Sequence, residues 1–127
     1  MDLRVLVLDD NPDILALVSA MLQRVFGSCQ IVTGRNGAEG LAVLAGPDSA
    51  PDIILSNLRM PQMDGFAFVR EVRRNTDWAG IGVVMMSALS TQDIRDEAQA
   101  IGAEVFLPKP FTYHDFKSAM DELPRTS

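Results

Sequence analysis

The sequence predicts an α/β domain with one five-stranded parallel sheet and helices on both of its faces. Five short apolar runs alternate with longer segments in which apolar residues recur at helical spacing. The runs are almost continuously apolar, which is typical of strands that are buried on both faces of a parallel sheet. The length of 127 residues fits a single domain with a sizeable core.

The elements are expected in strict alternation, strand first. The strands are predicted at 5–8, 29–32, 53–55, 83–86 and 104–107, and the helices at about 12–26, 38–44, 65–74, 91–101 and 113–123. Capping residues justify most helix ends, because Asn, Ser and Thr favour helix starts and Gly favours helix stops. The expected starts are Asn11 with Pro12, Asn36-Gly37, Ser90 or Thr91, and Thr112, and the expected stops are Gly27 and Gly102. We expect one domain at 1–124 and a short tail at 125–127.

Composition excludes several classes of function. The net charge of -6 makes binding to nucleic acid or to an anionic membrane surface a poor hypothesis, and it favours a cation or a basic partner. No apolar run is long enough for a membrane span or a signal peptide. The single cysteine, Cys29, cannot form an internal disulfide, so a cytoplasmic location is expected.

Polar residues follow four of the five predicted strands. Ligand sites in open parallel sheets lie beyond the carboxyl ends of the strands, so these residues are expected to face one crevice. Two carboxylates and a further oxygen suit Mg²⁺, and a lysine with a hydroxyl suits a phosphoryl group. No glycine-rich phosphate loop is present. The residues in question are Asp9 and Asp10, Asn57, Ser87 and Lys109.

Four segments in the same order resemble the receiver domain of bacterial two-component response regulators. They are VLVLDDN at 5–11, PDIILSNLRMPQMDG at 51–65, VVMMSA at 83–88 and FLPKPF at 106–111. The resemblance extends over about residues 3–123. It implies a flavodoxin-like (βα)5 fold, a role in phosphorelay signal transduction and no enzymatic function.

The resemblance also implies roles for the site residues. Asp9 and Asp10 would hold Mg²⁺ together with the backbone carbonyl of Arg59 and the side chain at position 57. Ser87 and Lys109 would contact the phosphoryl group, and Ser87 and Phe106 would act as the switch. Partners would be a sensor histidine kinase, a phosphotransfer protein or a downstream effector. The face formed by the fourth helix, fifth strand and fifth helix would bind partners or form a homodimer, and it includes Arg95, Phe106 and Lys117.

Position 57 departs from the family pattern. The family has a phosphoacceptor aspartate there, whereas this chain has Asn57, and the flanking Met60-Pro61 and 63–65 exclude an error of register. A carboxylate can attack phosphorus, but an amide oxygen is a poor nucleophile. Asn57 is therefore not expected to be phosphorylated, and Mg²⁺ binding is expected to be weakened or absent. The neighbouring Ser56 should point away from Asn57 on a strand, so it is a poor substitute.

Three hypotheses follow. The chain is a natural receiver that has lost phosphorylation and acts through protein–protein interaction, or it is an ordinary phosphorylatable receiver carrying an engineered Asp-to-Asn change at position 57. A small Mg²⁺-dependent phosphohydrolase is the third, because Asp9, Asp10 and Lys109 would allow metal-assisted hydrolysis. The phosphohydrolase hypothesis lacks a nucleophilic aspartate in a D-x-D arrangement.

Overall fold

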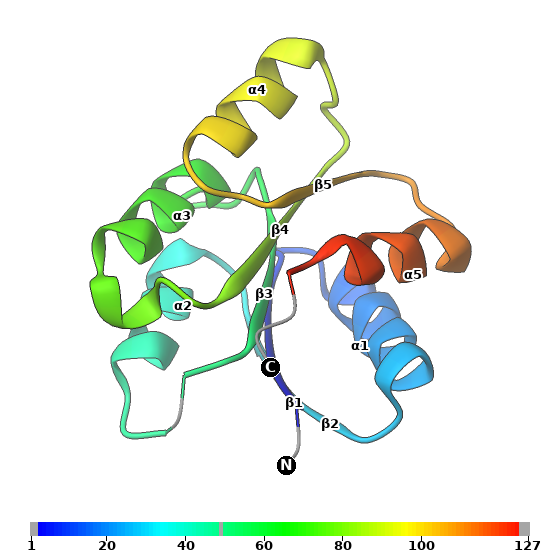
Figure 1. Ribbon diagram of the computed structural model, residues 1–127, viewed down its shortest axis with the longest axis horizontal. Helices are drawn as coiled ribbons and strands as arrows, with labels where there is room; N and C mark the ends of the chain where they lie inside the picture. Colours follow the sequence, from blue (N-terminus) through cyan, green and yellow to red (C-terminus); the bar gives the residue numbers. More distant parts are fainter. Residues whose placement is uncertain (1–2, 49, 125–127) are drawn as a thin grey trace.

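The computed structural model describes residues 3–48 and 50–124, so the tail expected at 125–127 lies outside the described residues. Five parallel strands form one sheet in the order β2-β1-β3-β4-β5 (Figure 1). The strands are β1 (Leu3–Leu8), β2 (Cys29–Gly34), β3 (Ile53–Asn57), β4 (Gly82–Ser87) and β5 (Val105–Pro108). The predicted α/β, flavodoxin-like arrangement is confirmed.

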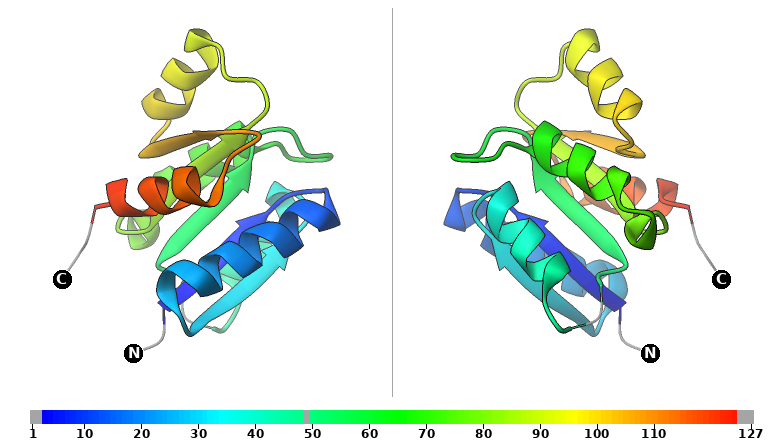
Figure 2. Two further views of the ribbon diagram at one scale, coloured as in Figure 1. Left: turned by 90° about the vertical axis from the view of Figure 1, so that its right-hand side faces the viewer. Right: turned by 90° about the vertical axis from the view of Figure 1, so that its left-hand side faces the viewer.

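Helices cover both faces of the sheet. They are α1 (Pro12–Phe26), α2 (Gly37–Ala45), α3 (Gly65–Arg74), α4 (Gln92–Ala100) and α5 (Tyr113–Glu122), with one 3-10 turn, η1 (Thr76–Trp78). The two side views separate α1 and α5 on one face from α2 and α3 on the other (Figure 2). Among the described residues, no helix combines the length and the apolar character that a membrane span requires.

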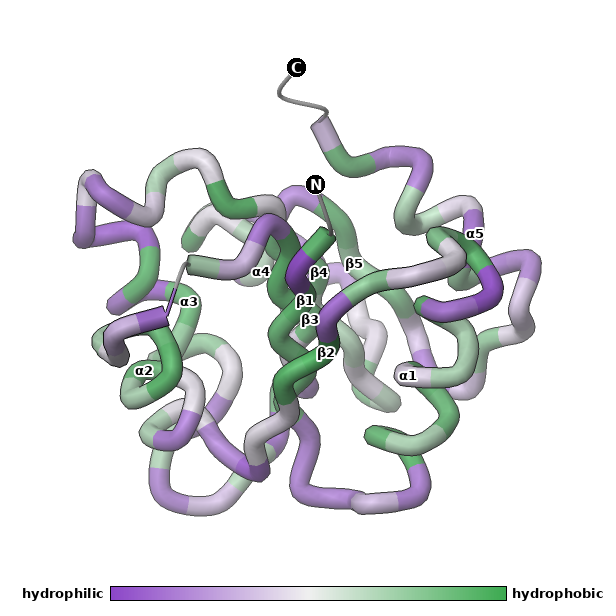
Figure 3. The backbone as a smooth tube through the Cα atoms, turned by 90° about the horizontal axis from the view of Figure 1, so that it is seen from below, coloured by the Kyte–Doolittle hydropathy of each residue, from purple (hydrophilic) through white to green (hydrophobic). Residues whose placement is uncertain are grey.

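The sheet divides the core into two clusters, because successive strand residues point to opposite faces. Val5 and Val7 of β1 pack with α1 and α5, whereas Leu6 and Leu8 pack with α2 and α3. All four side chains are fully buried. Viewed from below, the strands form a hydrophobic centre between the two helical layers (Figure 3). Burial on both faces explains why the strands are apolar throughout.

Most strands extend beyond their apolar runs, and β1 and β3 are examples. The strand predicted at 5–8 begins at Leu3, because Leu3 and Arg4 pair in register with Cys29 and Gln30 of β2. The strand predicted at 53–55 continues to Asn57, which pairs with Met86 of β4. Backbone pairing with the neighbouring strand therefore determines where these strands begin and end, and this pairing cannot be predicted from side-chain hydropathy.

The predicted caps at Asn11, Asn36 and Thr112 are present, and Thr91 rather than Ser90 caps α4. Gly27 ends α1 with a positive φ of 71°. The cap of α3 was missing from the prediction: the Asp64 side chain accepts a hydrogen bond from the Ala67 N–H at 2.8 Å. This cap begins α3 immediately after the loop that follows β3.

The capping box of α5 supports a prediction about stability. The Thr112 hydroxyl accepts from the Asp115 N–H at 3.0 Å, and the Asp115 carboxylate accepts from the Thr112 N–H at 2.9 Å. Thr112→Ala should lower the free energy of unfolding by about 1 kcal/mol, measured by urea denaturation. Ser118→Ala, at an exposed position of the same helix, is the control and should not lower it. Equal losses in both variants would contradict the assignment.

The same hydrogen bonds affect titration. The backbone N–H of Thr112, followed by its hydroxyl, lowers the pKa of Asp115 below its ordinary value. The charged carboxylate thus stabilises the fold above the ordinary carboxyl pKa, and this contribution is lost as the pH falls through the lowered pKa.

Arg73 forms hydrogen bonds to two loops at the amino-terminal edge of the sheet. Its guanidinium donates to the backbone oxygens of Gly102 and Ala79 at 3.1 and 3.2 Å and to the Glu104 carboxylate at 3.1 Å. The same Glu104 oxygen accepts from the Val83 N–H at 3.1 Å. One side chain of α3 therefore holds the loop before β4 and the turn between α4 and β5.

Candidate functional site

The ends of four strands meet at the carboxyl edge of the sheet. Asp9 follows β1, Asn57 and Ser87 end β3 and β4, and Lys109 follows β5. Backbone hydrogen bonds hold these ends together, since the Lys109 N–H donates to the Ser87 oxygen at 2.8 Å and the Leu58 N–H to the Met86 oxygen at 2.9 Å. The expected convergence of these strand ends is confirmed.

Lys109 bridges the ends of β1 and β3. Its ammonium group lies 2.7 Å from Asp9 Oδ2 and 3.0 Å from Asn57 Oδ1. The other oxygen of Asp9, Oδ1, accepts from the Asn11 N–H at 3.0 Å. The exposed fractions are 1% for Asp9, 8% for Asn57 and 16% for the Lys109 side chain. The buried Asp9 charge is thus paired with a cation, and each of its oxygens accepts a hydrogen bond.

The amide of Asn57 uses both of its ends. Nδ2 donates to the backbone oxygen of Arg59 at 2.7 Å, while Oδ1 accepts from Lys109. Lys109 can only donate and the Arg59 carbonyl can only accept, so the hydrogen bonds fix the orientation of the amide. A carboxylate at position 57 would be unable to make the contact to Arg59, because it has no hydrogen to donate.

These contacts decide how well the expected oxygens fit Mg²⁺. Asp9 Oδ2, Asn57 Oδ1 and the Arg59 carbonyl already accept hydrogen bonds from nitrogen donors. The ion would need its oxygen ligands at about 2.0–2.1 Å. The hydrogens of the nitrogen donors fill that space, and the positive charge of the Lys109 ammonium would repel the ion. Within the described part of the chain, no group of three acidic, histidine or cysteine side chains is arranged to hold a metal. The donor set as folded does not fit the ion.

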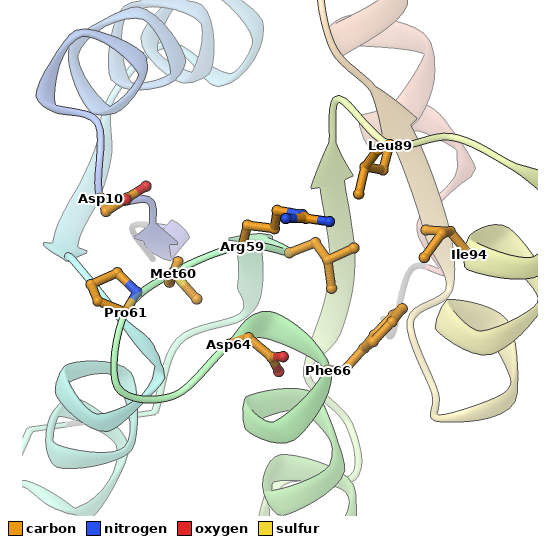
Figure 4. Close-up of a pocket in the computed structure, with 9 residues that line it drawn as sticks. Asp10, Arg59, Met60, Pro61, Asp64, Phe66, Leu89 and Ile94 are labelled. Carbon is orange, nitrogen blue, oxygen red and sulfur yellow. The ribbon is translucent and has the colours of Figure 1, made fainter.

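Asp10 lies apart from these contacts. Its carboxylate is exposed and, among the residues that the structure describes, makes no hydrogen bond or ion pair. It lines a groove of about 590 Å³ together with the side chains of Arg59 and Asp64. Figure 4 shows Arg59 extending between the loop after β3 and the side chain of Leu89. The remaining lining residues are apolar: Leu58, Met60, Pro61, Phe66, Leu89 and Ile94.

The two expected switch residues lie on neighbouring strands, Ser87 at the end of β4 and Phe106 within β5. The Ser87 hydroxyl is buried and accepts from the Leu89 N–H at 3.0 Å, which stabilises the turn after β4. Phe106 is half-buried, and the Arg95 guanidinium lies 4.9 Å from the centroid of its ring. Ser56, beside the site, is fully buried and donates to the Asn57 backbone oxygen at 3.0 Å.

Some features of the site escaped the sequence analysis. Three hydrogen bonds were not predicted. They run from the Asn11 N–H to Asp9, from the Leu89 N–H to Ser87, and from the Asn57 side-chain amide to the Arg59 backbone oxygen. Only the last had a signal in the sequence, because Asn differs from Asp in having two hydrogens to donate.

The comparisons with known proteins agree with this arrangement. The family model of the response regulator receiver domain matches residues 5–121. The probable chemotaxis protein CheY of Rhizobium etli is 28% identical over 119 residues, which cover 94% of this chain and 90% of that protein. The solved structure of chemotaxis protein CheY4 of Vibrio cholerae has a TM-score of 0.86 and 28% identity, covering 98% of this chain and 100% of that one.

The relatives differ in overall length. The sensor histidine kinase TmoS of Ectopseudomonas mendocina is 28% identical over 120 residues, which cover 94% of this chain but only 12% of that protein. The matched family model includes most of this chain, and the fold has the same five-stranded sheet with helices on both faces. The chain therefore belongs to the response regulator receiver domain family of two-component systems.

Proposed function

We propose that this receiver domain signals through protein–protein interaction and is not phosphorylated at Asn57. The observation that carries the proposal is the hydrogen-bonded amide at the end of β3, where the family pattern has a carboxylate. A phosphoryl acceptor must offer an oxygen lone pair to phosphorus as the donor's leaving group departs. The amide of Asn57 shares that density with its nitrogen, and its oxygen already accepts from Lys109.

Receiver domains generally are signalling rather than catalytic domains, and they interact with histidine kinases or phosphotransfer proteins and with effectors. For this chain we propose the same classes of partner, a cytoplasmic location and no enzymatic activity. Nothing in the geometry favours a phosphohydrolase, because the site offers no nucleophile at position 57. Direct contact with nucleic acid is not part of the proposal.

The partner surface that we propose is the face of α4, β5 and α5. Arg95 lies over Phe106 and also donates to the Ser90 oxygen at 3.1 Å, so two contacts hold the guanidinium on this face. Lys117 on α5 is exposed and adds a charged group to this face. Effector binding or homodimerisation would use these side chains.

Intact mass spectrometry tests the proposed function. The protein and its Asn57→Asp variant are incubated with a small-molecule phosphodonor and Mg²⁺. A phosphoryl adduct is expected only on the variant, because a carboxylate oxygen at position 57 can attack phosphorus and an amide oxygen cannot. An adduct of similar yield on the unchanged protein would overturn the proposal. Absence of an adduct from both would mean that the site has lost more than its carboxylate.

A further inference from the structure

We propose that Lys109 and the Asn57 amide together take the place of a divalent cation, so that the site keeps one arrangement whether or not Mg²⁺ is present. Asn57 is in this view a positioning residue and not an inert replacement for aspartate. The inference deepens the proposed function, because it says how a receiver without a phosphoacceptor keeps its loops in place.

A cation at this edge of the sheet would draw together the end of β1, the end of β3 and the loop after β3. The same three segments are already joined by nitrogen donors: Lys109 links Asp9 to the Asn57 oxygen, and the Asn57 nitrogen links to the Arg59 carbonyl. The distances of 2.7, 3.0 and 2.7 Å are those of good hydrogen bonds.

Charge supports the same conclusion. Asp9 and Lys109 neutralise one another at 2.7 Å, and Asn57 adds no charge. Among the described residues of the site, Asp10 is the carboxylate left without a hydrogen bond or ion pair, and a single carboxylate in water holds Mg²⁺ weakly because the ion gives up its own water reluctantly. Substitution of Asp at position 57 would add a second negative charge, and it would break the bond to the Arg59 carbonyl.

Thermal unfolding with and without Mg²⁺ tests the inference. The control is NaCl at the same ionic strength as the Mg²⁺ salt. The unchanged protein should have the same melting temperature in both solutions. Asn57→Asp should melt lower in the absence of Mg²⁺ and rise by roughly 5–10 °C at a hundredfold excess of the ion over its Kd. Asn57→Ala, which removes both hydrogen bonds but adds no charge, should melt lower than the unchanged protein and should not respond to Mg²⁺.

A spectroscopic measurement separates positioning from simple packing. The side-chain NH₂ signals of Asn57 in a ¹H–¹⁵N spectrum are identified by their loss in Asn57→Asp, and they should keep their positions when Mg²⁺ is added. A specific rise in melting temperature of the unchanged protein, or a displacement of these signals by Mg²⁺, would overturn the inference. So would an Asn57→Asp variant that ignores Mg²⁺, or an Asn57→Ala variant as stable as the unchanged protein.

These outcomes are separable from failure of the proposed function. A protein that binds Mg²⁺ but takes no phosphoryl group would overturn the cation replacement and leave the signalling proposal intact. A phosphoryl adduct on the unchanged protein would overturn the signalling proposal itself.

Discussion

Replacing Lys109 with methionine is expected to lower the free energy of unfolding by about 3–5 kcal/mol, measured by urea denaturation. Lys109 is the only residue whose side chain contacts the Asp9 carboxylate in the described part of the chain, and Asp9 is 1% exposed. Methionine fills a similar volume, so the loss of stability would come mainly from the unpaired buried charge of Asp9 and not from a cavity. The Asn57 oxygen would lose its donor as well.

A double-mutant cycle makes this prediction specific. Asp9→Asn combined with Lys109→Met removes both charges, so the double variant should lose clearly less than the sum of the two single losses. Lys117→Met is the matched control: its side chain is 54% exposed, it lies 3.8 Å from Asp121, and the change should cost less than about 1 kcal/mol. Strict additivity of the Asp9 and Lys109 changes would contradict a buried ion pair.

The second large effect is expected from Gly65→Ala. A Cβ at position 65 would lie 2.4 Å from the Asn57 backbone oxygen, closer than real Cβ atoms approach, and 3.0 Å from the Leu58 Cα, which is tighter than most Cβ contacts. Both neighbours are backbone atoms, so relief requires the loop after β3 to move. We expect a loss of about 2–3 kcal/mol in the free energy of unfolding, which the melting temperature will also report.

Gly80→Ala provides the control for this change. A Cβ at Gly80 meets no atom within 4 Å, and its φ lies outside the left-handed region. The same chemical change there should leave stability unchanged or slightly raised, because alanine restricts the unfolded chain. Similar losses in the two variants would show that the close approach of α3 to β3 is not what excludes a side chain at position 65.

The sequence predicted the sheet and helices well because hydropathy directly records burial. The strand 83–86 is a case in point: Val83 through Met86 are fully buried and alternate between the two core clusters. The caps at Asn11 and Thr112 were equally readable, since each acts on backbone groups two or three residues away. Local interactions of this kind leave a local pattern.

The site was predictable only in part. Parallel topology placed Asp9, Asn57 and Lys109 at one edge, but their hydrogen bonds join residues 52 and 100 positions apart. Which donor meets which acceptor depends on loop geometry that no short pattern encodes. Gln62 is an example of loop geometry that the sequence does not reveal. It lies in the loop after β3 and has a positive φ of 68°, which is unusual for a residue other than glycine.

The Arg73 contacts have a mechanical consequence for α4. The Arg73 side chain holds the carboxyl end of this helix through its hydrogen bond to the Gly102 oxygen. The ion pair of Glu97 with Arg70 holds the middle of the helix. Its first turn is held by other contacts, since the Arg95 guanidinium lies over the Phe106 ring of β5 and Ile94 packs against the core. Loss of the Arg73 side chain should therefore release the carboxyl end of α4, while its first turn stays in contact with β5.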